Sequence, residues 1–130
     1  MLKEGKSPIY EPGLEELMHK NKEKLKFTLD AKSAYKDAEV IYIGVGTPEK
    51  KDGSANLKYV YEVAEEIANS IERNCIVVIK STVPIGTNKK IEKYIKSHLS
   101  NKDVKVEVVS NPEFLSQGTA VKDTLHAQRI

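Results

Sequence analysis

The hydrophobic pattern along the chain alternates between short apolar runs and stripes at helical spacing. Apolar, mostly β-branched residues fill positions 40–45 almost without a break and positions 75–79 completely, and they alternate with charges from 104 to 109. Apolar runs of this length are typical of strands that are buried on both faces of a sheet. We therefore predict strands over these three segments, the last from Val104 to about Ser110, and a shorter strand at 26–29 (KFTL).

The segments between these strands carry apolar residues three and four positions apart. One such stripe predicts an amphipathic helix with Asn56 as the N-cap of that helix. The apolar residues of the stripe are Leu57, Val60, Ala64, Ile67, Ala68 and Ile71. A second helix is predicted from Thr87, with the stripe Ile91, Tyr94, Ile95 and Leu99. Upstream, we predict a helix over 12–25 with Pro12 in its first turn, and a brief helix over 30–38 capped by Asp30 or Ser33.

Strands that alternate with helices of this length indicate β-α-β units. A parallel neighbour can be reached only by a crossover connection, so the pattern predicts an α/β protein with a parallel sheet. No linker, low-complexity tract or repeat of fixed period interrupts residues 1–130. A length of 130 residues suits one domain, and we expect one domain or part of one.

Composition and charge exclude several classes of protein. Hydrophobic residues make up 39% of the chain and charged residues 31%, which is the balance of a globular protein. The formal net charge is only +2, and Glu23 breaks the basic run 19–26, so we predict no nucleic-acid partner. No apolar stretch approaches the roughly 20 residues of a membrane span, and the first ten residues lack the layout of a signal peptide, which favours a cytoplasmic protein.

Cys75 is the only cysteine, which excludes a disulfide within one chain and favours a reducing compartment. Its thiol could be a nucleophile, but no adjacent histidine or cation would activate it. Because it opens an apolar run, we predict a small buried hydrophobic residue and leave it out of the site. We also predict no metal site.

Three loops of unusual composition follow the three predicted strands, and they contain GVGTP, KSTVP and SNPEFLSQG in turn. The carboxyl ends of parallel strands lie on one edge of a sheet, and ligands bind in the crevice outside that edge. Prolines fix the backbone there, Gly44 and Gly46 permit close approach of a cofactor, and hydroxyls and a carboxylate can contact it. The pattern favours a ligand site built from three loops, with ordinary turn chemistry as the alternative.

Four segments resemble the motifs of a known family. PIYEPGLEEL, GVGTP, KSTVPIGT and SNPEFLSQGTAVKD, in this order and at these spacings, resemble the nucleotide-sugar dehydrogenases, and most closely the members that act on UDP-glucose. The resemblance extends from Gly5 to Ile130. Members of this family oxidise a sugar C6 alcohol to a carboxylate in two steps with two NAD+, through a cysteine-bound thiohemiacetal and thioester. The resemblance thus implies an NAD-dependent oxidoreductase with a Rossmann-type, doubly wound parallel sheet.

The resemblance also implies roles for individual residues. NAD would lie along five residues of the first loop: Val45, Gly46, Thr47, Pro48 and Glu49. The nicotinamide end of NAD would lie near Ser81, Thr82 and Val83 of the second loop. Thr82 would help to hold the water that hydrolyses the thioester, and Glu113 would be the acid/base carboxylate. The nucleotide sugar would be contacted by Glu113, Phe114, Leu115, Ser116 and Gln117. From its position alone, Glu113 could equally be a solvated or helix-capping glutamate at a strand exit.

Three features depart from the family's pattern. Many relatives carry a second glutamate where this chain has Gln117, and an amide cannot take up a proton at neutral pH. The chain contains no G-x-G-x-x-G, the turn that cradles the pyrophosphate, and the family's nucleophilic cysteine belongs to a later domain. We therefore expect residues 1–130 to be an internal fragment, the C-terminal half of an NAD-binding domain with a partial sheet.

Two alternatives are also compatible with the sequence. GDP-mannose or a UDP-N-acetylhexosamine could replace UDP-glucose, because the residues that distinguish these sugars lie mainly outside the segment. Alternatively, the chain could be a non-catalytic binding or assembly module that pairs through the open edge of the strand around Ile41. The sequence is also compatible with a homo-oligomer in the intact enzyme.

Overall fold

The structure, a computed structural model, describes residues 1–127, and these divide into two compact units. The α/β unit is Asp30–Glu113, and the second unit combines Met1–Leu29 with the residues from Phe114 onward.

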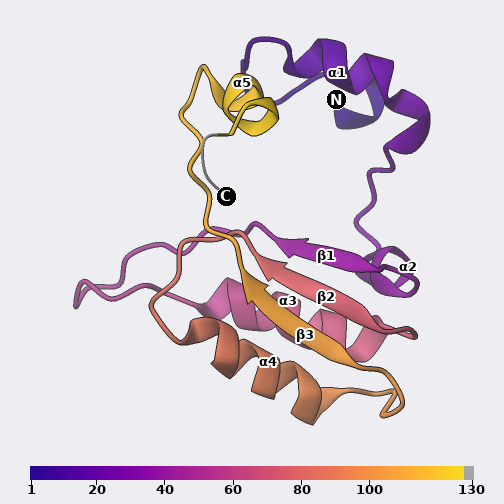
Figure 1. The fold of residues 1–130 in the computed structure, drawn as a ribbon, viewed down its shortest axis with the longest axis vertical. Coiled ribbons are helices and arrows are strands. Elements are labelled where there is room, and N and C mark those ends of the chain that lie inside the picture. The colour runs from indigo at the N-terminus through magenta and orange to yellow at the C-terminus, as the bar shows by residue number, and fades with distance from the viewer. Residues whose placement is uncertain (128–130) are drawn as a thin grey trace. The chain divides into compact units, whose positions relative to one another are not determined.

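The α/β unit contains one parallel sheet of three strands in the order β1-β2-β3 (Figure 1). The strands are β1 (Val40–Ile43), β2 (Cys75–Ile79) and β3 (Val106–Ser110), and the helices of the unit are α2 (Ala31–Tyr35), α3 (Lys58–Ser70) and α4 (Thr87–His98). Helix α3 joins β1 to β2, and α4 joins β2 to β3. The predicted α/β class and parallel sheet are confirmed, and so are the three strands, although the third begins at Val106 rather than Val104.

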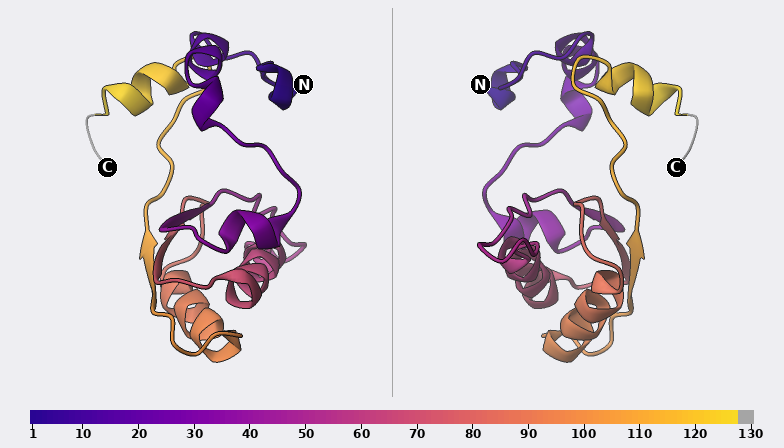
Figure 2. Two further views of the ribbon diagram at one scale, coloured as in Figure 1. Left: turned by 90° about the vertical axis from the view of Figure 1, so that its right-hand side faces the viewer. Right: turned by 90° about the vertical axis from the view of Figure 1, so that its left-hand side faces the viewer.

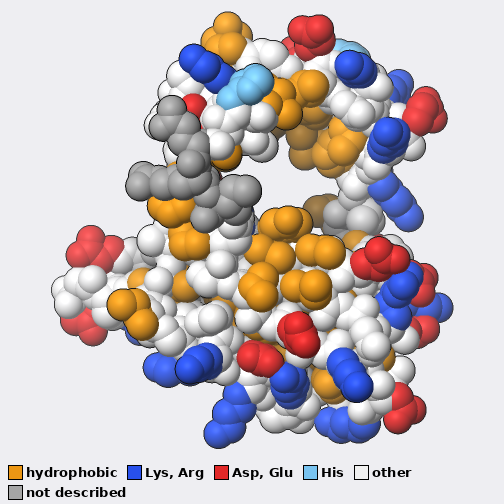
Figure 3. Space-filling view, viewed as in Figure 1, with side chains coloured by type: hydrophobic (Ala, Val, Ile, Leu, Met, Phe, Trp, Pro, Cys, Tyr) orange, Lys and Arg blue, Asp and Glu red, His pale blue; other side chains and the backbone are white. Residues whose placement is uncertain are grey.

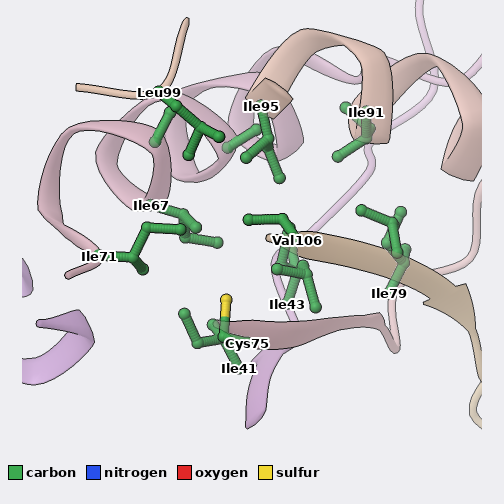
Figure 4. Close-up of a cluster of buried hydrophobic side chains, with 14 of the residues drawn as sticks. Ile41, Ile43, Ile67, Ile71, Cys75, Ile79, Ile91, Ile95, Leu99 and Val106 are labelled. Carbon is green, nitrogen blue, oxygen red and sulfur yellow. The ribbon is translucent and has the colours of Figure 1, made fainter. Parts of the chain in front are cut away.

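Helices α3 and α4 cover the same face of the sheet (Figures 1 and 2). The strand order runs in one direction, so right-handed crossovers place both helices on one side. Their predicted stripes meet the inward residues of the strands in a single apolar core, in which the largest fully buried side chains are Ile43, Ile67, Ile71, Ile79, Ile91, Ile95, Val60, Val77 and Val106 (Figure 4).

The opposite face of the sheet is apolar and largely uncovered, contrary to the expectation that the first strand is buried on both faces (Figure 3). Val40 is 47% exposed and Tyr42 is 65% exposed, while Ile41 and Ile43 between them are buried. The expectation fails because a second buried face needs helices on that side, and both crossover helices lie on the other. Ile76 and Val109 are also partly exposed on this face.

Local capping explains where two helices of the α/β unit begin. The Asp30 side chain accepts a hydrogen bond from the Ser33 amide and caps α2, as predicted. At α3 the Asn56 side chain accepts from the Lys58 amide at 3.1 Å, although Leu57 is the residue that immediately precedes the helix. The predicted cap is therefore displaced by one residue.

The second unit contains η1 (Leu2–Glu4), α1 (Leu14–Lys20), η2 (Lys22–Lys24) and α5 (Ala120–Leu125). The predicted helix over 12–25 is shorter than expected, because Glu11 to Leu14 form a β-turn first. The Leu14 amide donates to the Glu11 carbonyl, and Gly13 has φ 79° and ψ −8°, the left-handed geometry of position i+2 in a type II turn. Pro12 thus occupies position i+1 of the turn rather than the first helical turn.

The predicted strand at 26–29 is wrong, since these residues adopt no regular structure. A strand needs a hydrogen-bonded neighbour, and no strand among residues 1–127 pairs with this segment. Helix α5 was not predicted from the hydrophobic pattern. None of the described helices has the length and apolar character that a membrane span requires.

Candidate functional site

The three loops singled out in the sequence leave the α/β unit at one edge of its sheet. Ile43, Ile79 and Ser110 are in register at the carboxyl ends of the three parallel strands. The ladder extends one step past the strands, because the amides of Lys80 and Ser81 donate to the Ile43 carbonyl and the Asn111 amide donates to the Ile79 carbonyl. The predicted convergence of the loops on one edge is therefore confirmed.

Two hydrogen bonds tie the first loop to the second. The Ser81 hydroxyl is buried and donates to the Val45 carbonyl at 2.6 Å. The Thr47 hydroxyl donates to the Thr82 carbonyl at 2.8 Å. Since each bond joins a side chain of one loop to the backbone of the other, the two loops are held as one structural element.

A third hydrogen bond ties the second loop to the third. The half-buried Lys80 side chain donates from Nζ to Oδ1 of Asn111 at 2.9 Å. Asn111 stands two residues before Glu113, so this bond and the one from the Asn111 amide to the Ile79 carbonyl hold the start of the loop that carries Glu113. Neither Lys80 nor Asn111 was named as a site residue from the sequence, although both lie in the quoted motifs, because their contact spans two loops.

Gly44 and Gly46 leave the backbone of the first loop accessible. Neither glycine has a left-handed φ, and a Cβ added at either would meet no described atom within 4 Å. Backbone conformation and packing within the described chain therefore do not require glycine at these two positions. The open space beside them would admit a ligand close to the backbone, and the placement of NAD along this loop stays a prediction.

The first loop continues into a turn that is ordered by its own hydrogen bonds. Glu49 pairs with Ala55 in an isolated antiparallel bridge, and the Asn56 amide donates to the Pro48 carbonyl. Within the turn, hydrogen bonds from the Ser54 hydroxyl and then the Ser54 amide hold the pKa of Asp52 below its usual range. Pro48 and Glu49 are thus exposed residues at the base of a defined turn.

The predicted catalytic residues of the α/β unit are both exposed at this edge. Thr82 follows the buried Ser81, and its hydroxyl makes no hydrogen bond to any residue that the structure describes. Glu113 follows β3 and its carboxylate is exposed. Val45 and Val83 instead pack against the apolar core, so their side chains anchor the loops. The roles of these residues toward cofactor and substrate stay predictions.

The remaining predicted substrate residues, 114–117, belong to the second unit. Phe114 is 52% exposed and Leu115 is 37% exposed. The Ser116 amide donates to Oδ2 of Asp123, and Gln117 is exposed in the turn that follows. A buried carboxylate that sequence reasoning missed, Glu11, holds the other end of that turn. Its partners lie more than 100 residues away in the chain, so no local pattern signals the contact.

Cys75 lies at the amino end of β2, at the opposite edge of the sheet from the three loops. Its side chain is buried, and burial raises the pKa of its thiol. Both observations agree with a small buried hydrophobic residue. In the part of the chain that the structure describes, no three His, Cys, Asp or Glu side chains gather as metal ligands would.

Comparisons with known proteins agree on one family. The model for the NAD binding domain of the UDP-glucose/GDP-mannose dehydrogenase family matches residues 1–130. The chain is 47% identical over 131 residues to UDP-glucose 6-dehydrogenase YwqF of Bacillus subtilis, covering 99% of the chain and 30% of that relative. It is 46% identical over 132 residues to the UDP-glucose 6-dehydrogenase of Rhizobium meliloti, again covering 99% of the chain and 30% of the relative.

Solved structures give the same result. A UDP-glucose dehydrogenase from the archaeon Pyrobaculum islandicum superimposes with a TM-score of 0.90 at 38% identity, over 99% of this chain and 31% of that one. A GDP-mannose dehydrogenase from Pseudomonas aeruginosa superimposes with a TM-score of 0.84 at 40% identity, over 95% of this chain and 30% of that one. The chain thus spans about 30% of the length of the relatives it matches.

Proposed function

The chain belongs to the UDP-glucose/GDP-mannose dehydrogenase family, within its NAD-binding domain, and on that premise we propose that it works as part of an enzyme that oxidises UDP-glucose to UDP-glucuronate with NAD+. The observation that carries the proposal is the set of three hydrogen bonds that joins the exit loops at one sheet edge. Such an edge is where parallel α/β sheets bind nucleotides.

The reaction requires a cofactor-binding surface and an acid/base group. Conversion of a C6 alcohol to a carboxylate removes two hydrides, adds one oxygen from water and releases protons, so the site needs a cofactor surface and an acid/base group. When bound, NAD supplies the hydride acceptor for both oxidation steps. The open backbone at Gly44 and Gly46 offers the cofactor surface, and Glu113 offers a carboxylate at the same edge.

Thr82 and Glu113 suit the step that consumes water. The exposed Thr82 hydroxyl can hold a water molecule by hydrogen bonding, because its backbone is fixed by the bond from Thr47. Glu113 can accept the proton that this water loses when it attacks a thioester. In the second unit, Ser116 and Gln117 would donate hydrogen bonds to the nucleotide sugar, and Phe114 and Leu115 would supply apolar contact. Gln117 binds in this scheme but takes no proton.

UDP-glucose is proposed ahead of other nucleotide sugars because the curated relatives described above act on it by name at 46% and 47% identity. GDP-mannose is the next candidate, since the GDP-mannose dehydrogenase superimposes at 40% identity. Rates of NAD+ reduction with UDP-glucose and with GDP-mannose distinguish the two candidates.

Binding can be mapped on the chain itself by NMR. Titration of the ¹⁵N-labelled chain with millimolar NAD+ should shift the amides of 44–47, 49 and 81–83 and leave those at the amino ends of the strands unchanged. The comparison residue is Ile76, near the amino end of the central strand β2. Shifts confined to other surfaces, or none at all, would contradict the assignment of the cofactor surface.

Turnover can be tested in a chimera in which this chain replaces the matching segment of UDP-glucose 6-dehydrogenase YwqF. The chimera should reduce NAD+ with UDP-glucose faster than with GDP-mannose or a UDP-N-acetylhexosamine. Glu113→Gln should slow steady turnover by about 10²- to 10⁴-fold, because the carboxylate acts in water attack, while sparing a first burst of NADH. Rapid-quench mass spectrometry should then find a covalent acyl-enzyme.

The control for Glu113→Gln is Glu107→Gln, which makes the same change at an exposed position within β3. It should leave turnover unchanged. Full steady turnover of Glu113→Gln without an adduct would reduce Glu113 to a strand-exit carboxylate with no part in the reaction.

A further inference from the structure

Glu11 is the only charged residue among 1–127 whose side chain is buried, with 8% of the residue exposed. Its carboxylate accepts two backbone hydrogen bonds from the far end of the chain. Oε2 accepts from the Gly118 amide at 2.9 Å, and Oε1 accepts from the Ala120 amide at 2.6 Å. A buried carboxylate is stable only where its oxygens are satisfied, and here both are.

These two amides bracket a tight turn. The Thr119 amide donates to the Ser116 carbonyl, which closes a β-turn over Ser116 to Thr119, and Gly118 has φ 88°. This left-handed conformation is open to glycine and strained for other residues. The turn leads directly into α5 at Ala120. The Thr119 side chain accepts no hydrogen bond from an amide of the helix, and the Ala120 amide donates to Glu11 instead.

A second carboxylate holds the other end of the same turn. Oδ2 of Asp123 accepts from the Ser116 amide at 3.2 Å and from the Thr119 hydroxyl at 2.8 Å. Glu11 and Asp123 together therefore bind the backbone on both sides of Gln117. With Ser116 and Gly118 fixed, the Gln117 backbone has little freedom, and its side chain projects from an exposed position.

The contact with Glu11 orders this turn more than packing does. Among the described residues of the second unit no large apolar side chain is buried. The segment from Glu11 to Leu14 is itself a type II turn, which fixes the backbone that presents the Glu11 carboxylate. The turn at Glu11–Leu14 thus holds the turn at Ser116–Thr119 through charge-assisted hydrogen bonds, which are about twice as strong as neutral ones.

We propose that Glu11 is a positioning residue for the nucleotide sugar: its carboxylate sets the turn from which Ser116 and Gln117 contact the substrate. This inference rests on the proposed function for its substrate, and on the observed contacts for the positioning itself. Glu11 touches neither substrate nor cofactor in this scheme. It acts through the amides of Gly118 and Ala120.

The test uses Glu11→Gln, which keeps the shape of the side chain but replaces one acceptor oxygen by an NH2 donor. At least one of the two amides then loses its partner. In the ¹⁵N-labelled chain, hydrogen exchange at Gly118 or Ala120 should accelerate on the order of 10- to 100-fold. The matched control is Glu16→Gln, the same change at an exposed position of α1. It should leave the hydrogen-exchange rates of both amides unchanged. Unchanged shifts throughout the α/β unit and in α1 would show that both units of the variant are folded.

The second arm measures turnover of the same variants in the chimera described above. Glu11→Gln should raise the KM for UDP-glucose about tenfold and leave the KM for NAD+ unchanged. A purely structural role would lower the active fraction, and hence kcat, without this selectivity. Unaltered exchange at both amides, or an unaltered KM for UDP-glucose, would overturn the proposal. If the chimera that retains Glu11 turns over no nucleotide sugar, the proposed function fails, and the exchange experiment alone still decides whether Glu11 holds the turn.

Discussion

The α/β unit and the second unit differ in what their buried side chains are. In the α/β unit the buried side chains are almost all aliphatic and come from β1, β2, β3, α3 and α4. In the described part of the second unit the buried side chain is a carboxylate, and it is satisfied by backbone amides. The first unit is therefore stabilised mainly by the hydrophobic effect, and the second by charge-assisted hydrogen bonds.

This difference matches how each unit orders its own predicted site residues. The exit loops of the α/β unit begin at the buried core, and hydrogen bonds hold the backbone of Thr82 and the side chain of Asn111, two residues before Glu113. The turn that carries Ser116 and Gln117 depends on Glu11 and Asp123, and the contribution of Asp123 changes with protonation. Substitutions in the core should thus act on the stability of the α/β unit, while acid should act first on the turn.

The largest effect is expected from a cavity in the apolar core. Ile67 is fully buried at the interface of α3 with the sheet, and Ile67→Ala should lower the free energy of unfolding of the α/β unit by about 2–5 kcal/mol. Urea unfolding followed by circular dichroism would measure it. Ile85→Ala makes the same change at a fully exposed position and should cost less than about 0.5 kcal/mol. Equal losses for the two variants would show that the buried cluster is not the source of stability.

A smaller effect is expected where a polar group joins two loops on top of that core. Ser81→Ala removes the hydroxyl that donates to the Val45 carbonyl, and the loss should be about 1–3 kcal/mol because the carbonyl then lacks its partner. Thr82→Val, one residue on, removes an exposed hydroxyl and should leave stability within about 0.5 kcal/mol. If Ser81→Ala unfolds at the same urea concentration as the unchanged chain, water replaces the bond and the loops are not held by it.

The core could be predicted from the sequence, since it depends on local periodicity. The stripe of Ile91, Ile95 and Leu99 marks the buried side of α4 because residues three and four apart share a helix face. Exposure of Tyr42 could not be predicted, because burial of the second sheet face depends on which side the crossover helices occupy. The loops were found because proline and glycine mark strand exits in any α/β protein.

The positioning contacts could not be predicted for a different reason. The hydrogen bond from Lys80 to Asn111 joins residues 31 apart, and those to Glu11 join residues 107 and 109 apart. No periodicity relates such positions. The Pro12-Gly13 pair was visible and belongs to a type II turn, but it was interpreted as a helix start because both assignments suit proline.

The smallest expected effect is a change with pH in the turn of the second unit. Hydrogen bonds from the Thr119 hydroxyl and then the Ser116 amide hold the pKa of Asp123 below its usual range. A carboxyl whose pKa is lower in the folded state stabilises that state above its unfolded pKa, about 4, and the contribution disappears as the pH falls through the folded pKa. Acidification below about pH 4 should therefore loosen this turn while the uncharged core of the α/β unit persists. A ¹³C NMR titration of the Asp123 carboxyl, with the Ser116 amide as a second probe, would measure this loosening.

Thr119→Val should raise the pKa of Asp123 because it removes the hydroxyl that donates to the carboxylate. The control Thr124→Val removes a hydroxyl that donates to the Ala120 carbonyl, and it should leave the pKa of Asp123 unchanged. An Asp123 that titrates identically in all three chains would mean that the Thr119 bond does not stabilise the turn, and that the contrast between the two units rests on Glu11 alone.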